Sequence, residues 1–132
     1  MIINNCKKIV GGSGEGRALV TAQPINFLAM VDSRTGMITD PMHELYEKSL
    51  KGVVLVFPYS VGSSVGAYAI YSLGEYGTAP RAVVCTKADI TTASGCAIAS
   101  IPVVDLPKGA LTIRQNAITR VDADAGTITV KV

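Results

Sequence analysis

Three short apolar runs in the middle of the chain most constrain its fold: residues 53–57, 82–85 and 103–104. Unbroken apolar runs of this kind are typical of strands buried on both faces. Helical signals separate the runs, because apolar side chains recur at helical spacing over 65–76 and small residues fill 89–99. The alternation predicts a β-α-β-α-β core with parallel strands and right-handed crossovers.

Strand signals dominate both ends of the chain. Apolar residues between 2 and 10 predict an opening strand, and residues 17–22 predict a second one. Residues 27–39 and 121–128 predict hairpins or bent connections, because both contain the spacing V-D-x-x-x-G-x-I, in which Asp starts a turn and Gly supplies a positive φ. We therefore expect an α/β fold, a β/β/α domain whose parallel core is flanked by strands and hairpins, and a single domain over residues 1–132.

Composition and charge exclude several classes of protein. The chain is 48% hydrophobic and 17% charged, which excludes intrinsic disorder. Its net charge is only +2 and it has no basic run, so we expect no nucleic-acid partner. It has neither a stretch of about 18 apolar residues nor the apolar region of a signal peptide. We expect a cytoplasmic protein that does not bind membranes.

The three cysteines, Cys6, Cys85 and Cys96, match no zinc or iron–sulfur spacing. We expect buried, reduced thiols rather than catalytic residues or cluster ligands, and no metal or cofactor bound by this chain. With one histidine and no tryptophan, the chain has few side chains suited to acid–base chemistry. An enzyme working with these residues alone would lack catalytic groups.

The glycine-rich run 11–16 has the G-x-x-x-x-G spacing of a phosphate-binding loop. A Lys and a Ser or Thr should follow it, whereas Arg17 and Ala18 follow here and start a strand. The sequence therefore argues against nucleotide binding. We expect a mobile loop, one that could close over a substrate.

Two other groups of polar residues have structural explanations. Asp122 and Asp124 imitate the first ligands of a calcium loop, but the remaining ligands are missing, so a hairpin turn explains them better. His43 stands beside Glu44 with no nucleophile nearby in the sequence. We expect it at the surface or at a helix start rather than as an acid or base.

Gly62, Ser63 and Ser64 form the candidate site that we retain. They follow a buried strand and precede a helix, the place where open α/β sheets bind ligands, because free N–H groups and the helix dipole converge there. Gly62 lets a ligand approach the backbone closely. The alternative is that Ser63 merely caps the helix.

An ordered set of segments extends over most of the chain. It comprises G-R-A-L-V at 16–20, P-I-N-F at 24–27, V-D-S-R-T-G-M-I-T-D at 31–40, G-S-S at 62–64, A-P at 79–80 and I-P-V-V-D at 101–105. In this order the segments resemble the small, swivel-domain subunit of the aconitase X family. No single segment is specific, but the ordered set is.

This resemblance implies a fold like the swivelling domain of aconitases and the removal of water from a hydroxylated acid. It implies a heterodimer whose large subunit carries a [4Fe-4S] cluster. Carried over to this chain, Ser63 is the base that removes the substrate proton, and Gly62 and Ser64 bind the substrate.

The residues before the serines bear on the substrate. Many bacterial relatives have an Arg where this chain has Val61, so an anion contact is missing. The Ser-Val-Gly-Ser version resembles the archaeal branch, which implies dehydration of mevalonate 5-phosphate to trans-anhydromevalonate 5-phosphate in the modified mevalonate pathway. The alternatives are a hydroxyproline dehydratase subunit, a non-catalytic assembly or swivel module, and a free-standing binder with run 11–16 as its lid.

A serine base requires help from outside this chain. Ionising a hydroxyl with a pKa of about 15.7 at neutral pH costs about 12 kcal/mol, and a helix N-terminus supplies at most ~2 kcal/mol. We therefore expect an active site completed by the large subunit. Within this chain, the candidate contacts for a substrate anion are Arg17, Arg34, Arg81 and Lys87.

Overall fold

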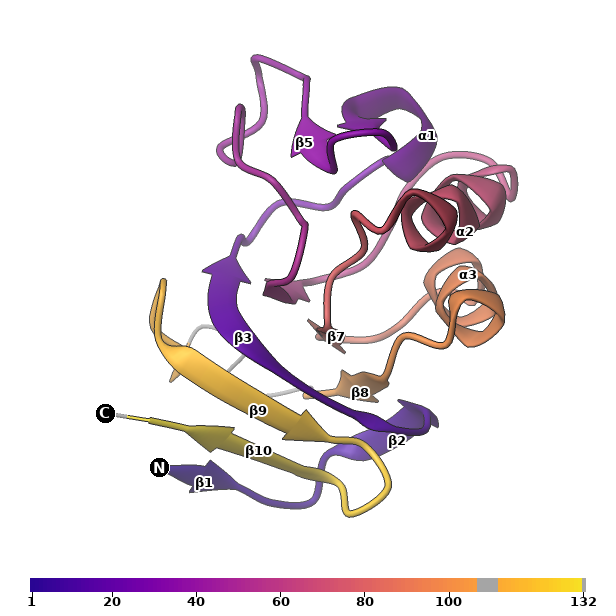
Figure 1. Ribbon diagram of the computed structural model, residues 1–132. Helices are drawn as coiled ribbons and strands as arrows, with labels where there is room; N and C mark the ends of the chain where they lie inside the picture. Colours follow the sequence, from indigo (N-terminus) through magenta and orange to yellow (C-terminus); the bar gives the residue numbers. More distant parts are fainter. Residues whose placement is uncertain (107–111, 132) are drawn as a thin grey trace.

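The computed structural model describes residues 1–106 and 112–131 (Figure 1). The strands are β1 (Ile2–Ile3), β2 (Lys7–Val10), β3 (Ser13–Val20), β4 (Val31–Asp32), β5 (Met37–Ile38), β6 (Val54–Phe57), β7 (Ala82–Cys85), β8 (Val103–Asp105), β9 (Ile118–Asp122) and β10 (Thr127–Val130). The helices are α1 (Phe27–Met30), α2 (Gly66–Tyr76) and α3 (Ile90–Ala99). Eight strands form one sheet in the order β1-β10-β9-β3-β6-β7-β8-β2, and β4 pairs with β5.

The predicted β-α-β-α-β core is confirmed. Strand β6 pairs in parallel with β3 on one side and with β7 on the other, and β7 pairs in parallel with β8. Helix α2 connects β6 to β7 and helix α3 connects β7 to β8. All parallel strands therefore end at the same edge of the sheet, which we call the carboxyl edge.

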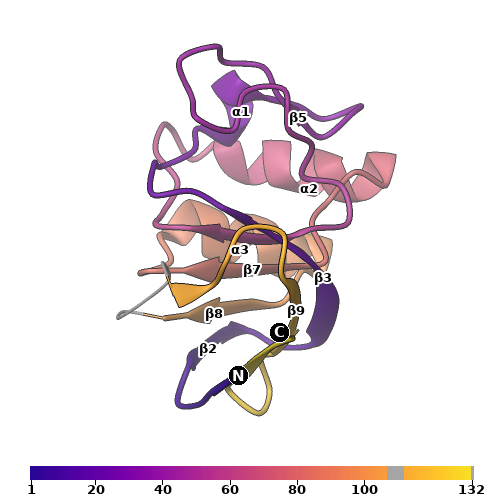
Figure 2. The same cartoon turned by 90° about the vertical axis from the view of Figure 1, so that its left-hand side faces the viewer.

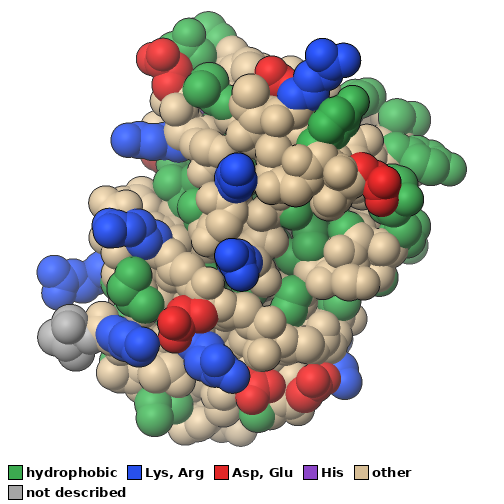
Figure 3. Space-filling view, viewed as in Figure 1, with side chains coloured by type: hydrophobic (Ala, Val, Ile, Leu, Met, Phe, Trp, Pro, Cys, Tyr) green, Lys and Arg blue, Asp and Glu red, His purple; other side chains and the backbone are tan. Residues whose placement is uncertain are grey.

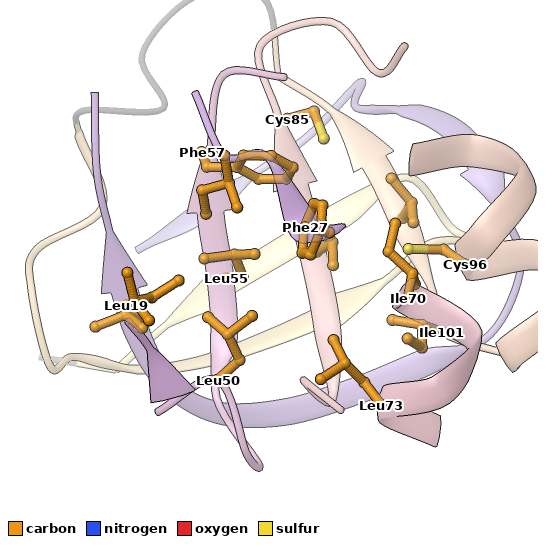
Figure 4. Close-up of a cluster of buried hydrophobic side chains, with 14 of the residues drawn as sticks. Leu19, Phe27, Leu50, Leu55, Phe57, Ile70, Leu73, Cys85, Cys96 and Ile101 are labelled. Carbon is orange, nitrogen blue, oxygen red and sulfur yellow. The ribbon is translucent and has the colours of Figure 1, made fainter. Parts of the chain in front are cut away.

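The apolar runs are buried on both faces because the parallel strands are the middle of three layers, between the helices and the strands β9 and β10. In β6, Leu55 and Phe57 pack toward the helices, where Phe57 meets the ring of Phe27 edge-on at 5.7 Å between centroids (Figure 4). Val54 and Val56 point the other way, into a second core shared with β9 and β10. In Figure 2 the helices lie behind the parallel strands and β9 lies in front of them, so the β/β/α arrangement is confirmed.

Strand β3 belongs to both sheet layers. Its residues 13–17 pair with β9, and its residues 18–20 pair with β6. The glycine-rich run is therefore not the mobile loop that we expected, because residues 13–16 lie in this strand. A Cβ atom at Gly14 would lie 2.2 Å from the carbonyl oxygen of Arg81, and one at Gly16 would lie 2.4 Å from that of Gly52. The glycines let β3 cross close over neighbouring backbone, and the proposed lid does not exist.

The single opening strand was also a wrong prediction. Two strands form instead, with β1 beside β10 and β2 beside β8, at opposite ends of the strand order. Asn5 turns the chain between them with a φ of 63°, and the N–H of Cys6 donates to the carbonyl of Gly126 at 3.0 Å.

Both predicted Asp–Gly turns are confirmed as hairpins, β4–β5 and β9–β10. Their glycines, Gly36 and Gly126, have φ values of 75° and 68°. The carboxylate of Asp32 accepts from the N–H of Arg34. Residues 27–30, however, form the short helix α1 rather than a strand. None of the helices in the described ranges is long and apolar enough to cross a membrane.

Candidate functional site

The loop between β6 and α2 carries Gly62, Ser63 and Ser64 at the carboxyl edge, as the sequence predicts. It passes beside α1 (Figure 1), and all three residues are exposed. Gly62 has a φ of 103°, and a Cβ atom there would lie 2.6 Å from the side-chain nitrogen of Asn26. The loop conformation therefore requires glycine, because any side chain at this position would meet Asn26 in a backbone conformation that L residues rarely adopt.

One side of this loop is held by the segment that follows β3. The N–H of Val61 donates to the carbonyl of Ile25 at 3.0 Å, and the N–H of Ile25 donates to the carbonyl of Tyr59 at 3.4 Å. Asn26 in turn caps α1, with its side-chain oxygen accepting from the N–H of Ala29. The loop is thus tied by backbone hydrogen bonds to the neighbouring strand connection.

The other side is held by Asp89, the N-cap of α3. One carboxylate oxygen accepts from the N–H of Ser60 at 2.8 Å, and the other accepts from the Ser60 hydroxyl. The same carboxylate accepts from the N–H and hydroxyl of Thr92. Partial burial raises the pKa of Asp89, but the hydrogen bonds from Ser60 and Thr92 outweigh it, so the net pKa is below its ordinary value. Asp89 stays ionised and fixes the loop of residues 58–65, which we call the serine loop, against α3.

Ser63 does not cap helix α2 through its side chain, so this alternative is wrong. The residue before the helix is Val65, already helical in conformation, and no side chain caps it. Ser63 and Ser64 use their carbonyls instead, accepting from the N–H groups of Gly66 and Ala67 at 3.0 and 3.1 Å. Within the described ranges the Ser63 hydroxyl has no hydrogen-bond partner. It is exposed and available for chemistry.

The backbone around the serines also offers free donors. In the part of the chain that the structure describes, the N–H groups of Ser63, Ser64 and Val65 have no acceptor. They precede an 11-residue helix, whose dipole adds partial positive charge at this end. Adjacent free N–H groups at a helix N-terminus bind carboxylate or phosphate oxygens.

A groove between α2 and α3 continues from Ser64. It has a volume of about 510 Å³, and its apolar lining includes Tyr68, Tyr71, Ile90 and Ile98. Tyr68 is 72% exposed and Ile90 is 81% exposed. Hydrophobic side chains gather on this side of the molecule in Figure 3. Large apolar side chains gathered in an exposed groove are typical of surfaces that bind another molecule.

The sequence matches a known family of domains over almost its whole length. The sequence model of the aconitase X swivel domain matches residues 3–130. The chain belongs to the aconitase X swivel domain family. The family resemblance of the ordered segments is thereby confirmed.

Relatives and a solved structure place the chain within this family. It is 46% identical over 121 residues to the phosphomevalonate dehydratase small subunit of Methanothrix thermoacetophila, covering 91% of this chain and 87% of that protein. It is 39% identical to the subunit of the same name from Thermococcus kodakarensis, over 92% and 91% of the two chains. The crystal structure of Thermococcus kodakaraensis aconitase X in its holo-form superposes with a TM-score of 0.94 at 36% identity, covering 100% of this chain and 99% of that one.

The cysteines of this swivel domain do not fit a metal or cluster site. Cys85 and Cys96 lie in the core under the helices, whereas Cys6 lies in the core between the sheet layers. Burial raises the pKa of each thiol, that of Cys96 to about 12. Among the residues described, no three His, Cys, Asp or Glu side chains converge in a group that could hold a metal ion.

His43 is part of the interior, contrary to the surface or helix-start position that we expected. It is 6% exposed, and its Nδ1 accepts from the N–H of Leu45 at 3.0 Å while Nε2 lies 3.2 Å from the carbonyl of Pro24. The neighbouring Glu44 accepts from the hydroxyl of Thr21 and the N–H of Ala22, and these hydrogen bonds lower its pKa despite desolvation. These residues anchor the 40–50 segment rather than catalyse.

Sequence reasoning missed the residues that position the serines. Asp89 was visible only as the start of a small-residue segment, and nothing in the sequence connects it with Ser60, 29 positions earlier. Nothing in the sequence around Asn26 indicates that its side chain lies against Gly62. Asp122 and Asp124 lie in and after β9 as predicted for a turn, with Asp124 paired to Lys8 at 3.0 Å.

Proposed function

We propose that this chain is the small subunit of a heterodimeric phosphomevalonate dehydratase, a cytoplasmic hydro-lyase of the modified mevalonate pathway. Its substrate is mevalonate 5-phosphate and its product trans-anhydromevalonate 5-phosphate. The names of the relatives at 46% and 39% identity support the activity. The observation that carries the role of this chain is the exposed Ser63 hydroxyl, without a hydrogen-bond partner in the described ranges and held at the carboxyl edge.

The reaction assigns a task to each group of the serine loop. Dehydration breaks the C2–H and C3–O bonds of the substrate, forms the C2=C3 double bond and releases water. Ser63 accepts the C2 proton. The carboxylate on C2 lies on the free N–H groups of Ser64 and Val65, which Gly62 leaves accessible.

Ser63 needs stabilisation that this chain does not contain. Ionising a serine at neutral pH costs about 12 kcal/mol, and a helix N-terminus offers at most ~2 kcal/mol. The [4Fe-4S] cluster that we assign to the large subunit supplies Lewis acidity for the departing hydroxyl. The partner also excludes water, which strengthens every charge interaction at the site.

The large subunit covers the serine loop and the groove beside it. The groove begins at Ser64, so a protein that reaches the substrate at Ser63 also meets the groove. The residues that line it carry no charge, and Tyr68 and Ile90 are more than two-thirds exposed. Apolar, aromatic surface of this kind fits the buried centre of a stable protein interface.

Anaerobic reconstitution tests this function. The chain is mixed with its large subunit and supplied with mevalonate 5-phosphate or, in parallel, with hydroxyproline, and the products are identified by mass spectrometry. We expect dehydration of mevalonate 5-phosphate by the mixture and none by this chain alone. Turnover of hydroxyproline instead would contradict the substrate, and turnover by the isolated chain would contradict the shared site.

A further inference from the structure

We propose that Lys87 binds the phosphate group of the substrate. The proposal rests on the function proposed above and adds a residue that determines specificity. It comes from the position of Lys87 at the carboxyl edge, the charges around it and the length of the substrate.

Lys87 directly adjoins the loop that carries the serines. It follows β7, the strand next to β6, and its N–H donates to the carbonyl of Pro58 at 3.3 Å. Pro58 and Tyr59 start the serine loop, and with Lys87, Ala88 and Asp89 they line a hollow of about 500 Å³. This hollow is large enough for a phosphate group and lies beside the candidate site.

Among the residues that the structure describes, the charges at this edge leave Lys87 available to an anion. The carboxylate of Asp89 is engaged by Ser60 and Thr92, and Asp105 accepts from the N–H of Ala88 at 2.8 Å. Lys87 is exposed and forms no ion pair with any of residues 1–106 or 112–131. A lysine without a carboxylate partner binds phosphate as a point charge.

The topology removes the other three candidate cations from the site. Arg17 and Arg81 immediately precede Ala18 and Ala82, both in register with Val54 at the start of β6, so they lie at the opposite edge of the sheet. Arg34 lies in the β4–β5 turn.

The β4–β5 turn, which carries Arg34, packs against the C-terminal end of α2, away from the serine loop. There the hydroxyl of Thr78, just after the helix, donates to the carbonyl of Ser33. Lys7 is at the carboxyl edge but pairs with Asp105 of β8, three strands from β6 in the sheet order. Lys87 is thus the nearest of these cations to the serine loop by strand order.

The dimensions of the substrate agree with this position. With C2 at Ser63, the phosphate on C5 lies three carbon–carbon bonds further along the chain. Neighbouring strands are about 4.8 Å apart, so the paired ends of β6 and β7, from which the two loops start, are one strand spacing apart. A lysine has a flexible four-carbon stem, which lets its ammonium group reach away from its own backbone.

The test compares Lys87→Met and Lys87→Arg with Arg81→Met in the reconstituted two-subunit enzyme. We expect Lys87→Met to raise KM for mevalonate 5-phosphate at least tenfold, with a smaller change in kcat, and to raise the inhibition constant of inorganic phosphate by a similar factor. Lys87→Arg should recover most of both. Arg81→Met is the matched control, exposed at the opposite edge, and should leave both constants unchanged.

The results separate this proposal from the proposed function. If the unmodified enzyme dehydrates mevalonate 5-phosphate but Lys87→Met leaves KM and phosphate inhibition unchanged, the assignment of Lys87 is wrong and the function stands. If the unmodified enzyme does not act on mevalonate 5-phosphate, both are wrong. An unchanged thermal unfolding temperature for Lys87→Met verifies that the exposed substitution leaves the fold intact.

Discussion

Asp89 and Ser60 are 29 positions apart in the sequence, yet the Asp89 carboxylate accepts hydrogen bonds from both the N–H and the hydroxyl of Ser60. Asp89 also caps α3. One side chain therefore fixes two features of the site, the start of a helix and the path of the loop that presents Ser63.

Replacing Asp89 by Ala should lower the free energy of unfolding by about 2.5–4 kcal/mol. The change removes a helix cap, at about 1 kcal/mol, and hydrogen bonds to a charged group, at about 1.5–3 kcal/mol. Urea unfolding measures this loss. Asp124→Ala is the control, because Asp124 is exposed and its ion pair with Lys8 lies at the surface, so stability should change little.

The difference in stability between the wild type and Asp89→Ala should also depend on pH. Because the folded pKa of Asp89 is below its ordinary value of 3.8, its contribution to stability is complete above that value and is lost as the pH falls through the lower, folded pKa. The difference in stability between the wild type and Asp89→Ala should therefore shrink in acid. A difference that stays constant below pH 3.8 would contradict the assigned ionised state.

Gly62→Ala should disrupt the serine loop. Its φ of 103° and its contact with Asn26 predict a loss of about 1–3 kcal/mol of stability and loss of most dehydratase activity. The matched control is Gly52→Ala, which also has a positive φ, 73°, but open space around the added Cβ. It should lose about 1–2 kcal/mol and retain activity. Equal activity of the two variants would show that the loop path does not matter.

The three cysteines should be unreactive in the folded protein. All are buried and their thiol pKa values are raised by desolvation, so little thiolate forms at about pH 8. Titration with a chromogenic disulfide should give no fast reaction in buffer and three equivalents in denaturant. A fast-reacting thiol in the native protein would overturn the structural role of these residues.

Charges in the groove between α2 and α3 should weaken assembly with the large subunit. We expect Tyr68→Glu and Ile90→Glu each to raise the dissociation constant by about 30-fold, since exposed anchors at the centre of an interface contribute about 2 kcal/mol. Sedimentation velocity measures the complex. Ile2→Glu, at a residue 63% exposed on β1, should leave assembly unchanged. If all three variants assemble equally well, the large subunit does not cover the groove.

The central strands could be predicted from the sequence because their burial is symmetrical. Val54 and Leu55 face different cores, so the run lacks the alternation of a half-exposed strand and identifies a middle layer. The serine loop could be placed for the same reason, since it follows such a strand.

The features that the sequence did not disclose depend on contacts between distant segments. Gly14 is in a strand because β3 crosses the backbone at Arg81, and a local pattern of glycines cannot distinguish this from a mobile loop. His43 is buried because two backbone groups satisfy its ring nitrogens. The link from Asp89 to Ser60 likewise exists only after β6 and β7 have paired.

The most direct test of the account is Ser63→Ala in the reconstituted enzyme. Because the Ser63 side chain caps no helix, we expect the free energy of unfolding and assembly with the large subunit to be unchanged, while the rate of dehydration of mevalonate 5-phosphate falls at least a thousandfold. A variant that assembles normally and dehydrates at the wild-type rate would contradict the claim that Ser63 is the base.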